Sequence, residues 1–429
     1  MTAPLPRPGG QIHINVNILN AGVFGGSWRV PENDPLSAYT VEHYMDIAKK
    51  AEAAKLDAVF LADGPVIEKD LEYRPGNSFE PSVLLARIAA ETSHIGLIGT
   101  FSSSYNGPGE LASRLASLDT LSGGRFGWNV VTTAGAAAAA NFGLAGEPDH
   151  AGRYVRASEV TSQVVRAWAG AGETGALPAT PQGRPVVVQA GASKAGIRFA
   201  GEHAEVIFTA AQTLGEALDF RRAIDGQAAA FGRRPEEIAI LPGLSTVIGS
   251  TEAEAQERRR LLAGLVPLPY AIGRLGGQLG VDLKDVDLDA PVRRGGLPEP
   301  EAAAGSQTFY RMVLGIIERD KPTYRQLLHT LGGGAGHRIV VGTPEQIADD
   351  IERWHRAGAA DGFNVMPDAL PSGFDQFVDH VIPELQRRGL FREEYEGHTL
   401  RGHLNLPVQP AVRREPPVHA GAGHSGGAA

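Results

Sequence analysis

Short apolar segments alternate with longer amphipathic segments along most of this chain. The short segments have the length of strands, and the longer ones carry apolar residues at the spacing of helices. Because the short segments are almost continuously apolar, we expect burial on both faces, as in a parallel sheet. The segments predicted to be strands are 11–19, 57–63, 95–101, 125–133, 185–190, 205–210, 238–248 and 361–366. A predicted helix eventually follows each of them, which indicates repeated βαβ units.

Eight βα units in a chain of 429 residues favour a closed (β/α)8 barrel, the TIM-barrel fold, over an open sheet. The prediction is one barrel domain over 11–404. A long segment at 267–337 interrupts the repeat between the seventh and eighth units. Such an insertion in a βα loop fits a lid over a substrate site or a contact between subunits equally well. Residues 405–429 contain four prolines and a glycine-rich end, and are predicted to form a disordered tail.

The composition of the chain argues against several classes of function. The chain has 49 acidic and 40 basic residues, a net charge of −9, which argues against binding nucleic acid or a membrane through a basic face. No apolar stretch approaches the roughly 18 residues of a membrane span. The first ten residues lack the apolar core of a secretory signal, so we expect a cytoplasmic protein. The absence of cysteine excludes disulfides, thiolate metal sites and a cysteine nucleophile.

Sequence motifs for common cofactors are also missing. The chain has no phosphate loop of the G-x-x-x-x-G-K-[ST] type, no H-E-x-x-H, and no G-x-G-x-x-G after a strand. ATP, catalytic zinc and a dinucleotide on a Rossmann fold are therefore not expected, and no metal site is predicted.

In a barrel of this kind the chemistry lies at the carboxyl ends of the strands. That position selects Asp63, Thr100, 129–133, 189–193 and Asn364. Asp63 ends an apolar strand, where a carboxylate is costly unless it is solvated or hydrogen-bonded. We therefore favour a functional role for Asp63 over a role as a helix or turn cap.

The sequence GASKAG at 191–196 joins a predicted strand directly to a helix. Glycine permits close backbone approach, and the free N–H groups of a helix start attract a phosphate. Ser193 in this turn is also a suitable N-cap, which is a purely structural alternative. The segment resembles the G-x-S-x-G motif of hydrolases, but its fifth position is Ala195, so a serine hydrolase is a weak alternative.

His150 and Tyr154 lie four residues apart on a predicted helix and so share one face. Near a helix start, an imidazole and a phenol could hold a phosphate or the edge of an isoalloxazine ring. A pair at this spacing is more often ordinary packing, so spacing alone favours packing over function.

A combination of motifs resembles one known family, the nitrilotriacetate/dibenzothiophene-sulfone monooxygenase group of the bacterial luciferase-like superfamily. The resemblance extends from about the first predicted strand to Leu404. The segments that carry it are FLAD at 60–63, LDTLSGGRFGWNVVTT at 118–133, NFG at 141–143, H-x-x-R-Y at 150–154, QAGASKAG at 189–196, DGFNVMP at 361–367 and EYEGHTLRGHL at 394–404.

This resemblance implies a (β/α)8 barrel that takes reduced FMN (FMNH2) from a separate NAD(P)H:flavin reductase. It implies a reaction with O2 in which a flavin hydroperoxide oxygenates a small organic substrate, and a homo-oligomer, either dimer or tetramer. The implied flavin contacts are Asp63 and Thr100 beside the isoalloxazine, His150 and Tyr154 at the flavin or its phosphate, and Ala192 with Ser193 at the phosphate. His150 is also the implied catalytic residue. A deazaflavin-dependent oxidoreductase and a non-catalytic flavin-binding protein stay as alternatives, and the substrate is left open.

Overall fold

The computed structural model describes residues 10–67, 73, 75–76, 79–146, 149–170, 177, 180–299, 307–331, 333 and 336–409. Within these residues, nine strands form one sheet in which every recorded strand pairing is parallel. The strands are β1 (His13–Asn17), β2 (Ala58–Leu61), β3 (Gly96–Ser102), β4 (Phe126–Val131), β5 (Val186–Ala190), β6 (Val206–Thr209), β7 (Ala239–Ile248), β8 (Arg338–Gly342) and β9 (Gly362–Pro367).

Eight of these strands close into the predicted TIM barrel. The strand order is β6-β5-β4-β3-β2-β1-β9-β7, and the additional pairing of β6 with β7 closes the ring. The helices around and beyond the ring are α1 (Val41–Ala53), α2 (Pro81–Glu91), α3 (Pro108–Leu121), α4 (Ala136–Asn141), α5 (His150–Trp168), α6 (Lys194–His203), α7 (Leu214–Ala230), α8 (Glu252–Gly264), α9 (Leu268–Leu279), α10 (Gln307–Asp320), α11 (Tyr324–Leu331), α12 (Pro344–Arg356), α13 (Ser372–Gln376), α14 (Ile382–Arg387) and α15 (Leu400–His403). None of the described helices is both long and apolar enough to cross a membrane.

The strand β8 was not predicted. The ten-residue β7 pairs with β6 along Ala239–Pro242 and with β8 along Leu244–Ile248. The strand β8 is only five residues long, its apolar run covers the three residues 339–341, and it directly precedes a strong helix start at Thr343, so its sequence pattern is weak. It therefore extends the wall of the barrel beyond the end of β6 without adding a ninth strand to the ring.

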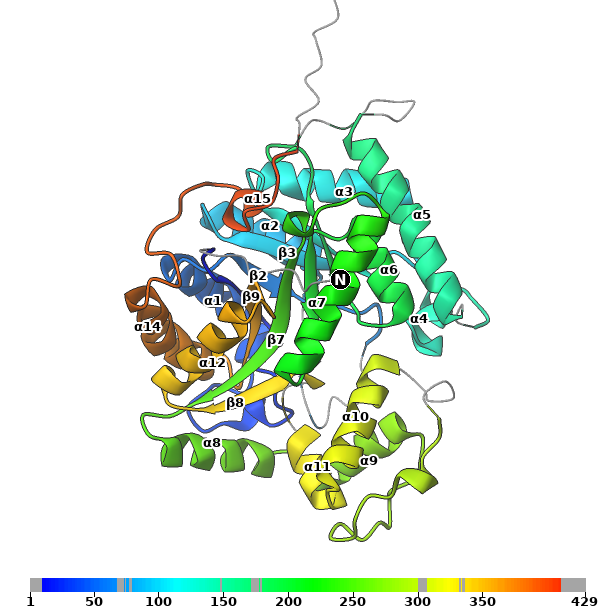
Figure 1. The fold of residues 1–429 in the computed structure, drawn as a ribbon, viewed down its shortest axis with the longest axis vertical. Helices are drawn as coiled ribbons and strands as arrows, with labels where there is room; N and C mark the ends of the chain where they lie inside the picture. The colour runs from blue at the N-terminus through cyan, green and yellow to red at the C-terminus, as the bar shows by residue number, and fades with distance from the viewer. Residues whose placement is uncertain are drawn as a thin grey trace, which may run out of the picture.

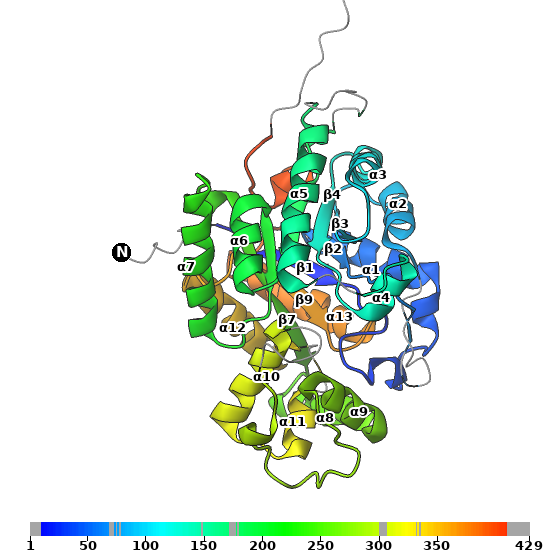
Figure 2. The same ribbon diagram turned by 90° about the vertical axis from the view of Figure 1, so that its right-hand side faces the viewer.

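The insertion predicted at 267–337 lies at the carboxyl ends of the strands. Figure 1 shows α9, α10 and α11 as a separate group of helices at the end of the barrel opposite α15, and Figure 2 shows the same arrangement after a quarter turn. These three helices share their own apolar cluster, which includes Leu275, Leu279, Tyr310, Val313 and Leu327. The insertion is thus a small subdomain set over the mouth of the barrel.

Side chains alternate between the two faces of each strand, and this alternation divides the core. On β1, Ile14 and Val16 pack outward in the large cluster between sheet and helices. On β2, Ala58 and Phe60 belong to a second, interior cluster. Leu400, Leu404 and Leu406 join that interior cluster and seal the amino-terminal end of the barrel. Residues 405–409 of the predicted tail are therefore partly packed, while 410–429 lie outside the described residues.

A buried ion cluster anchors this seal. Glu205 accepts hydrogen bonds from both Arg184 and Arg401 at 2.6–3.1 Å, and its side chain is only 4% exposed. Burial alone would raise the pKa of Glu205, but the two guanidinium groups outweigh it and lower that pKa to about 2. Since Arg401 belongs to α15, the pair ties the C-terminal helix to the start of β6.

We expect Glu205→Gln to destabilise the fold at pH 7 by about 3–5 kcal/mol, because it leaves two guanidinium groups without their carboxylate. The pKa of this carboxyl is lower in the folded than in the unfolded state, so its contribution is present above about pH 4.5 and is lost as the pH falls toward about 2. The free-energy difference between variant and parent in urea unfolding should shrink over that range. Glu257→Gln, in an exposed pair with Arg260, is the control and should change stability by less than about 1 kcal/mol. If Glu205→Gln and Glu257→Gln changed the free energy of unfolding equally, Glu205 would not anchor the C-terminal helix.

Candidate active site

Buried polar side chains line the carboxyl half of the barrel interior. Asn129 of β4 donates to Thr100 Oγ1 of β3 at 2.9 Å, and both side chains are buried. Among the described residues, Asn129 Oδ1 has no hydrogen-bond partner. The same holds for further buried polar atoms of Asn15, Asn17, Ser245 and Asn364, on β1, β7 and β9. Buried polar atoms without partners are rare and costly, so the interior is suited to bind a polar molecule or ordered water.

The β5–α6 turn lies beside this polar interior. Ser193 is the N-cap of α6, and its hydroxyl accepts from the Gly196 N–H at 3.1 Å. The N–H groups that start a helix have no intrahelical acceptor, so this turn offers donors and a positive dipole end. Ala192 packs its side chain against the apolar cluster behind α6, which leaves only its backbone for a ligand. The local geometry is that of an anion site.

Tyr154 of α5 meets the same turn. A Cβ built on Gly191 would lie 2.9 Å from the Tyr154 hydroxyl, and one on Gly196 would lie 3.0 Å from it. Gly191 also has φ +155°, a conformation that other residues rarely adopt. The two glycines therefore allow the phenol to approach the backbone of the turn closely.

His150 opens α5 and lies next to Tyr154, with ring centroids 5.1 Å apart. Burial lowers the pKa of His150, and the nearby positive charges of Arg153 and Arg311 lower it further below the usual 6.5. The imidazole is consequently neutral at pH 7, with one donor and one acceptor nitrogen. Arg311 belongs to α10, so the insertion contributes charge to this part of the mouth.

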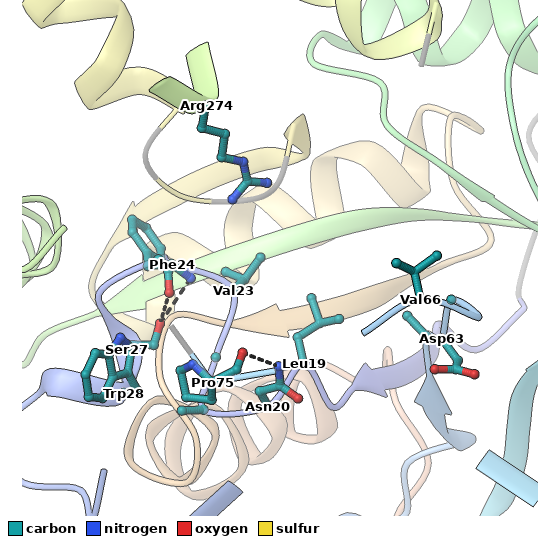
Figure 3. Close-up of a pocket in the computed structure, with 15 residues that line it drawn as sticks. Leu19, Asn20, Val23, Phe24, Ser27, Trp28, Asp63, Val66, Pro75 and Arg274 are labelled. Atoms are coloured by element: carbon teal, nitrogen blue, oxygen red, sulfur yellow. Dashed lines mark hydrogen bonds between the residues drawn. The ribbon is translucent and has the colours of Figure 1, made fainter. Parts of the chain in front are cut away.

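A cavity of about 530 Å³ opens on the other side of the mouth. Its walls come from the loop after β1, the end of β2, the segment near Pro75, and α9 of the insertion (Figure 3). Asp63 and Arg274 are the charged residues among those that line it. In Figure 3, Arg274 extends from α9 toward Val23 and Phe24, while Asp63 lies beside Val66. Asp63 is therefore at the rim of a cavity large enough for a small organic molecule.

Tyr154 lies at the turn that contains Ala192 and Ser193, and His150 lies beside Tyr154. Thr100 lies on β3, between the Asp63 side and the Ser193 side of the ring, because β3 and β4 separate β2 from β5. All six predicted contact residues thus lie at or near the carboxyl ends of the strands, and their roles stay a prediction.

Sequence reasoning missed part of the site. Asn15 and Asn17 alternate with Ile14 and Val16 in β1, and that period of two could have indicated an inward polar face. No comparable signal marks Arg274 and Arg311, because their positions depend on how the insertion folds back over the mouth.

The residues present fit FMN. The glycine cradle and helix start at 191–196 suit a phosphate, since a Cβ at Gly191 would fill the space beside Tyr154. The amide oxygens of Asn17 and Asn129, which have no partner in the described part of the chain, suit the polar edge of a heterocycle.

Comparison with known proteins agrees with this architecture. The sequence profile of the family described as "Luciferase-like monooxygenase" matches residues 26–361. Component A of nitrilotriacetate monooxygenase from Aminobacter aminovorans is 40% identical, over 92% of this chain and 96% of that protein. Dibenzothiophene-sulfone monooxygenase from Rhodococcus erythropolis is 34% identical, over 91% of this chain and 95% of that protein. The structure of EDTA monooxygenase from Chelativorans sp. BNC1 matches with a TM-score of 0.76 and 33% identity, covering 94% of this chain and all of that one.

These relatives are named monooxygenases, and the chain is an enzyme of that class. The chain belongs to the luciferase-like monooxygenase family, in the group that contains the nitrilotriacetate and dibenzothiophene-sulfone monooxygenases.

We expect Arg311→Gln to raise the pKa of His150, because it removes one of the positive charges that disfavour the imidazolium. The measurement is an NMR titration of the imidazole C2 proton, assigned by its loss in His150→Ala. Arg319→Gln removes a charge from the same helix, where Arg319 pairs with Asp320, and should leave the titration midpoint unchanged. A midpoint that does not move in Arg311→Gln, or moves equally in both variants, would show that Arg311 makes no specific contribution to the pKa of His150.

Proposed function

We propose that this chain is the oxygenase component of a two-component system. It takes FMNH2 from a separate NAD(P)H:flavin reductase and uses O2 to oxygenate a small organic substrate. The observation that carries the proposal is the position of the helix start at Ser193, whose N–H groups suit an anion, beside a barrel mouth whose buried asparagine oxygens have no partner among the described residues. The relatives support it, because all three are named monooxygenases and one is named as component A, which implies a partner component. A homo-oligomer and a single barrel domain over 11–404 belong to the same proposal.

When bound, the reduced flavin supplies the electrons that activate O2 for transfer of one oxygen atom. The chain's own part is to bind, orient and shield. The N–H groups at the start of α6 and the Ser193 hydroxyl would hold the phosphate, and Tyr154 would donate a hydrogen bond to it at the same turn. Thr100 and Asp63 would position the ring system. The insertion over the mouth limits the access of water.

His150 is the proposed catalytic residue. Its lowered pKa keeps it neutral at pH 7, so it can donate a hydrogen bond from one ring nitrogen and accept one at the other. At the start of α5 and next to Tyr154, it would hydrogen-bond to the reacting part of the bound flavin without adding a positive charge.

The phosphate contact is tested by Ser193→Asp, which keeps an N-cap acceptor but adds a negative charge. We expect the affinity for reduced FMN, measured by anaerobic titration, to fall at least about tenfold through charge repulsion, while the affinity for reduced riboflavin stays the same. Thr213→Asp makes the same change at the N-cap of α7 and should affect neither. Equal loss for FMN and riboflavin would place the phosphate elsewhere. If the parent protein bound neither reduced FMN nor reduced riboflavin, or bound a deazaflavin instead, the assignment of FMN as the cofactor would be wrong.

The role of His150 is tested in an assay coupled to a flavin reductase. We expect His150→Ala to lower the yield of oxygenated product per O2 consumed by about tenfold, the loss of roughly 1.4 kcal/mol of stabilisation. Its Tm should stay within a few degrees of the parent, because His150 is only partly buried. Candidate substrates include nitrilotriacetate and dibenzothiophene sulfone, and mass spectrometry reads the product. Unchanged yield would reject His150 as a catalytic residue, and O2 consumption by the parent with no product from any substrate would favour a non-catalytic flavin-binding protein.

A further inference from the structure

We infer that the cavity beside Asp63 binds a small organic acid, and that Arg274 holds its anionic group. This inference rests on the proposed function, since it names the class of substrate for that same active site. The relatives named above divide into those named for polycarboxylates and one named for an uncharged sulfone. The single arginine among the described residues at this cavity favours a ligand with an anionic group for this chain.

The floor of the cavity is apolar and firmly held. Its described lining includes Leu19, Val23, Phe24, Val66 and Pro75. The loop that carries the first three is fixed to the end of β9, because Val23 N donates to Pro367 O at 3.0 Å and Leu370 N donates to Ala21 O at 2.7 Å. A floor of this kind receives the apolar body of a ligand without rearranging.

Arg274 supplies the charge at the roof. Its Nη1 lies 3.5 Å from the hydroxyl of Tyr270, one turn earlier on α9, and Tyr270 in turn stacks on Tyr73 with ring centroids 5.2 Å apart. Among the described residues, no carboxylate forms an ion pair with Arg274. Its guanidinium thus lies at the cavity with its planar set of donors available, a geometry that matches a carboxylate.

The negative charge in the cavity, that of Asp63, lies away from Arg274. Asp63 is at the end of β2 beside Val66, whereas Arg274 lies above Val23 and Phe24 (Figure 3). An acid held by Arg274 would therefore extend along the apolar floor, with its uncharged part toward Asp63 and the barrel mouth. This orientation presents the uncharged part of the substrate to the site of oxygen transfer.

The test compares acids with uncharged analogues of the same shape. The probes are nitrilotriacetate with nitrilotriacetamide, and (phenylthio)acetate with its amide, measured by isothermal titration calorimetry on the FMN-loaded and FMN-free protein. We expect at least one acid to bind tenfold more tightly than its amide. Arg274→Gln should remove that preference, and Arg274→Lys should retain part of it.

The matched control is Arg293→Gln, which removes another exposed charge from the same insertion at a different surface hollow. It should leave binding of the acids unchanged, and Arg274→Gln should leave FMN affinity unchanged. The inference is overturned if neither acid binds better than its amide, if Arg274→Gln binds the acid as the parent does, or if the two variants lose affinity equally. Failure of FMN binding in the parent, with Arg274-dependent binding of the acid intact, would instead overturn the proposed function alone.

Discussion

The closed parallel sheet is the constraint on which the site depends. Because all eight strands of the ring run in the same direction, their carboxyl ends meet at one mouth, and residues as distant in sequence as Asn17 and Asn364 line the same interior. Alternation along each strand then decides which side chains enter that interior. Changing the register of one strand by one residue would exchange its polar face for its apolar face and remove its share of the site.

The two ends of the barrel differ in whether their buried polar groups have partners within the protein. At the amino-terminal end, Leu400 and Leu404 fill the interior, and Glu205 is satisfied by two arginines. At the carboxyl end, the amide oxygens of Asn17 and Asn129 are buried without partners among the described residues. A protein gains no stability from such groups, so their presence is consistent with a site that a ligand completes. Stability and function are thereby concentrated at different ends of one fold.

The insertion contributes charged side chains to the mouth of the barrel. Its helices pack on their own apolar cluster, but they also contribute Arg311 near His150 and Arg274 at the cavity beside Asp63. The barrel therefore supplies the polar interior, while the insertion adds charge to the adjoining cavity. This division agrees with relatives that share most of their length with this chain and are named for chemically different substrates.

The sequence by itself determined the repeated βα pattern, the closed barrel, the position of the insertion and the family, since all of these depend on local periodicity and contiguous motifs. It also selected Asp63, Thr100, His150, Tyr154, Ala192 and Ser193 as candidate contacts. Only the tertiary structure showed that β8 extends β7, that Asn15 and Asn17 face the interior, and that Leu406 belongs to the seal at the amino end. The positions of Arg274 and Arg311 were likewise decided by tertiary structure. Arg311 acts on His150, and Arg274 lies at a cavity lined by the loop after β1, so both meet residues far away in the chain. Such proximity arises from the folding of the insertion over the mouth and leaves no periodic trace in the sequence.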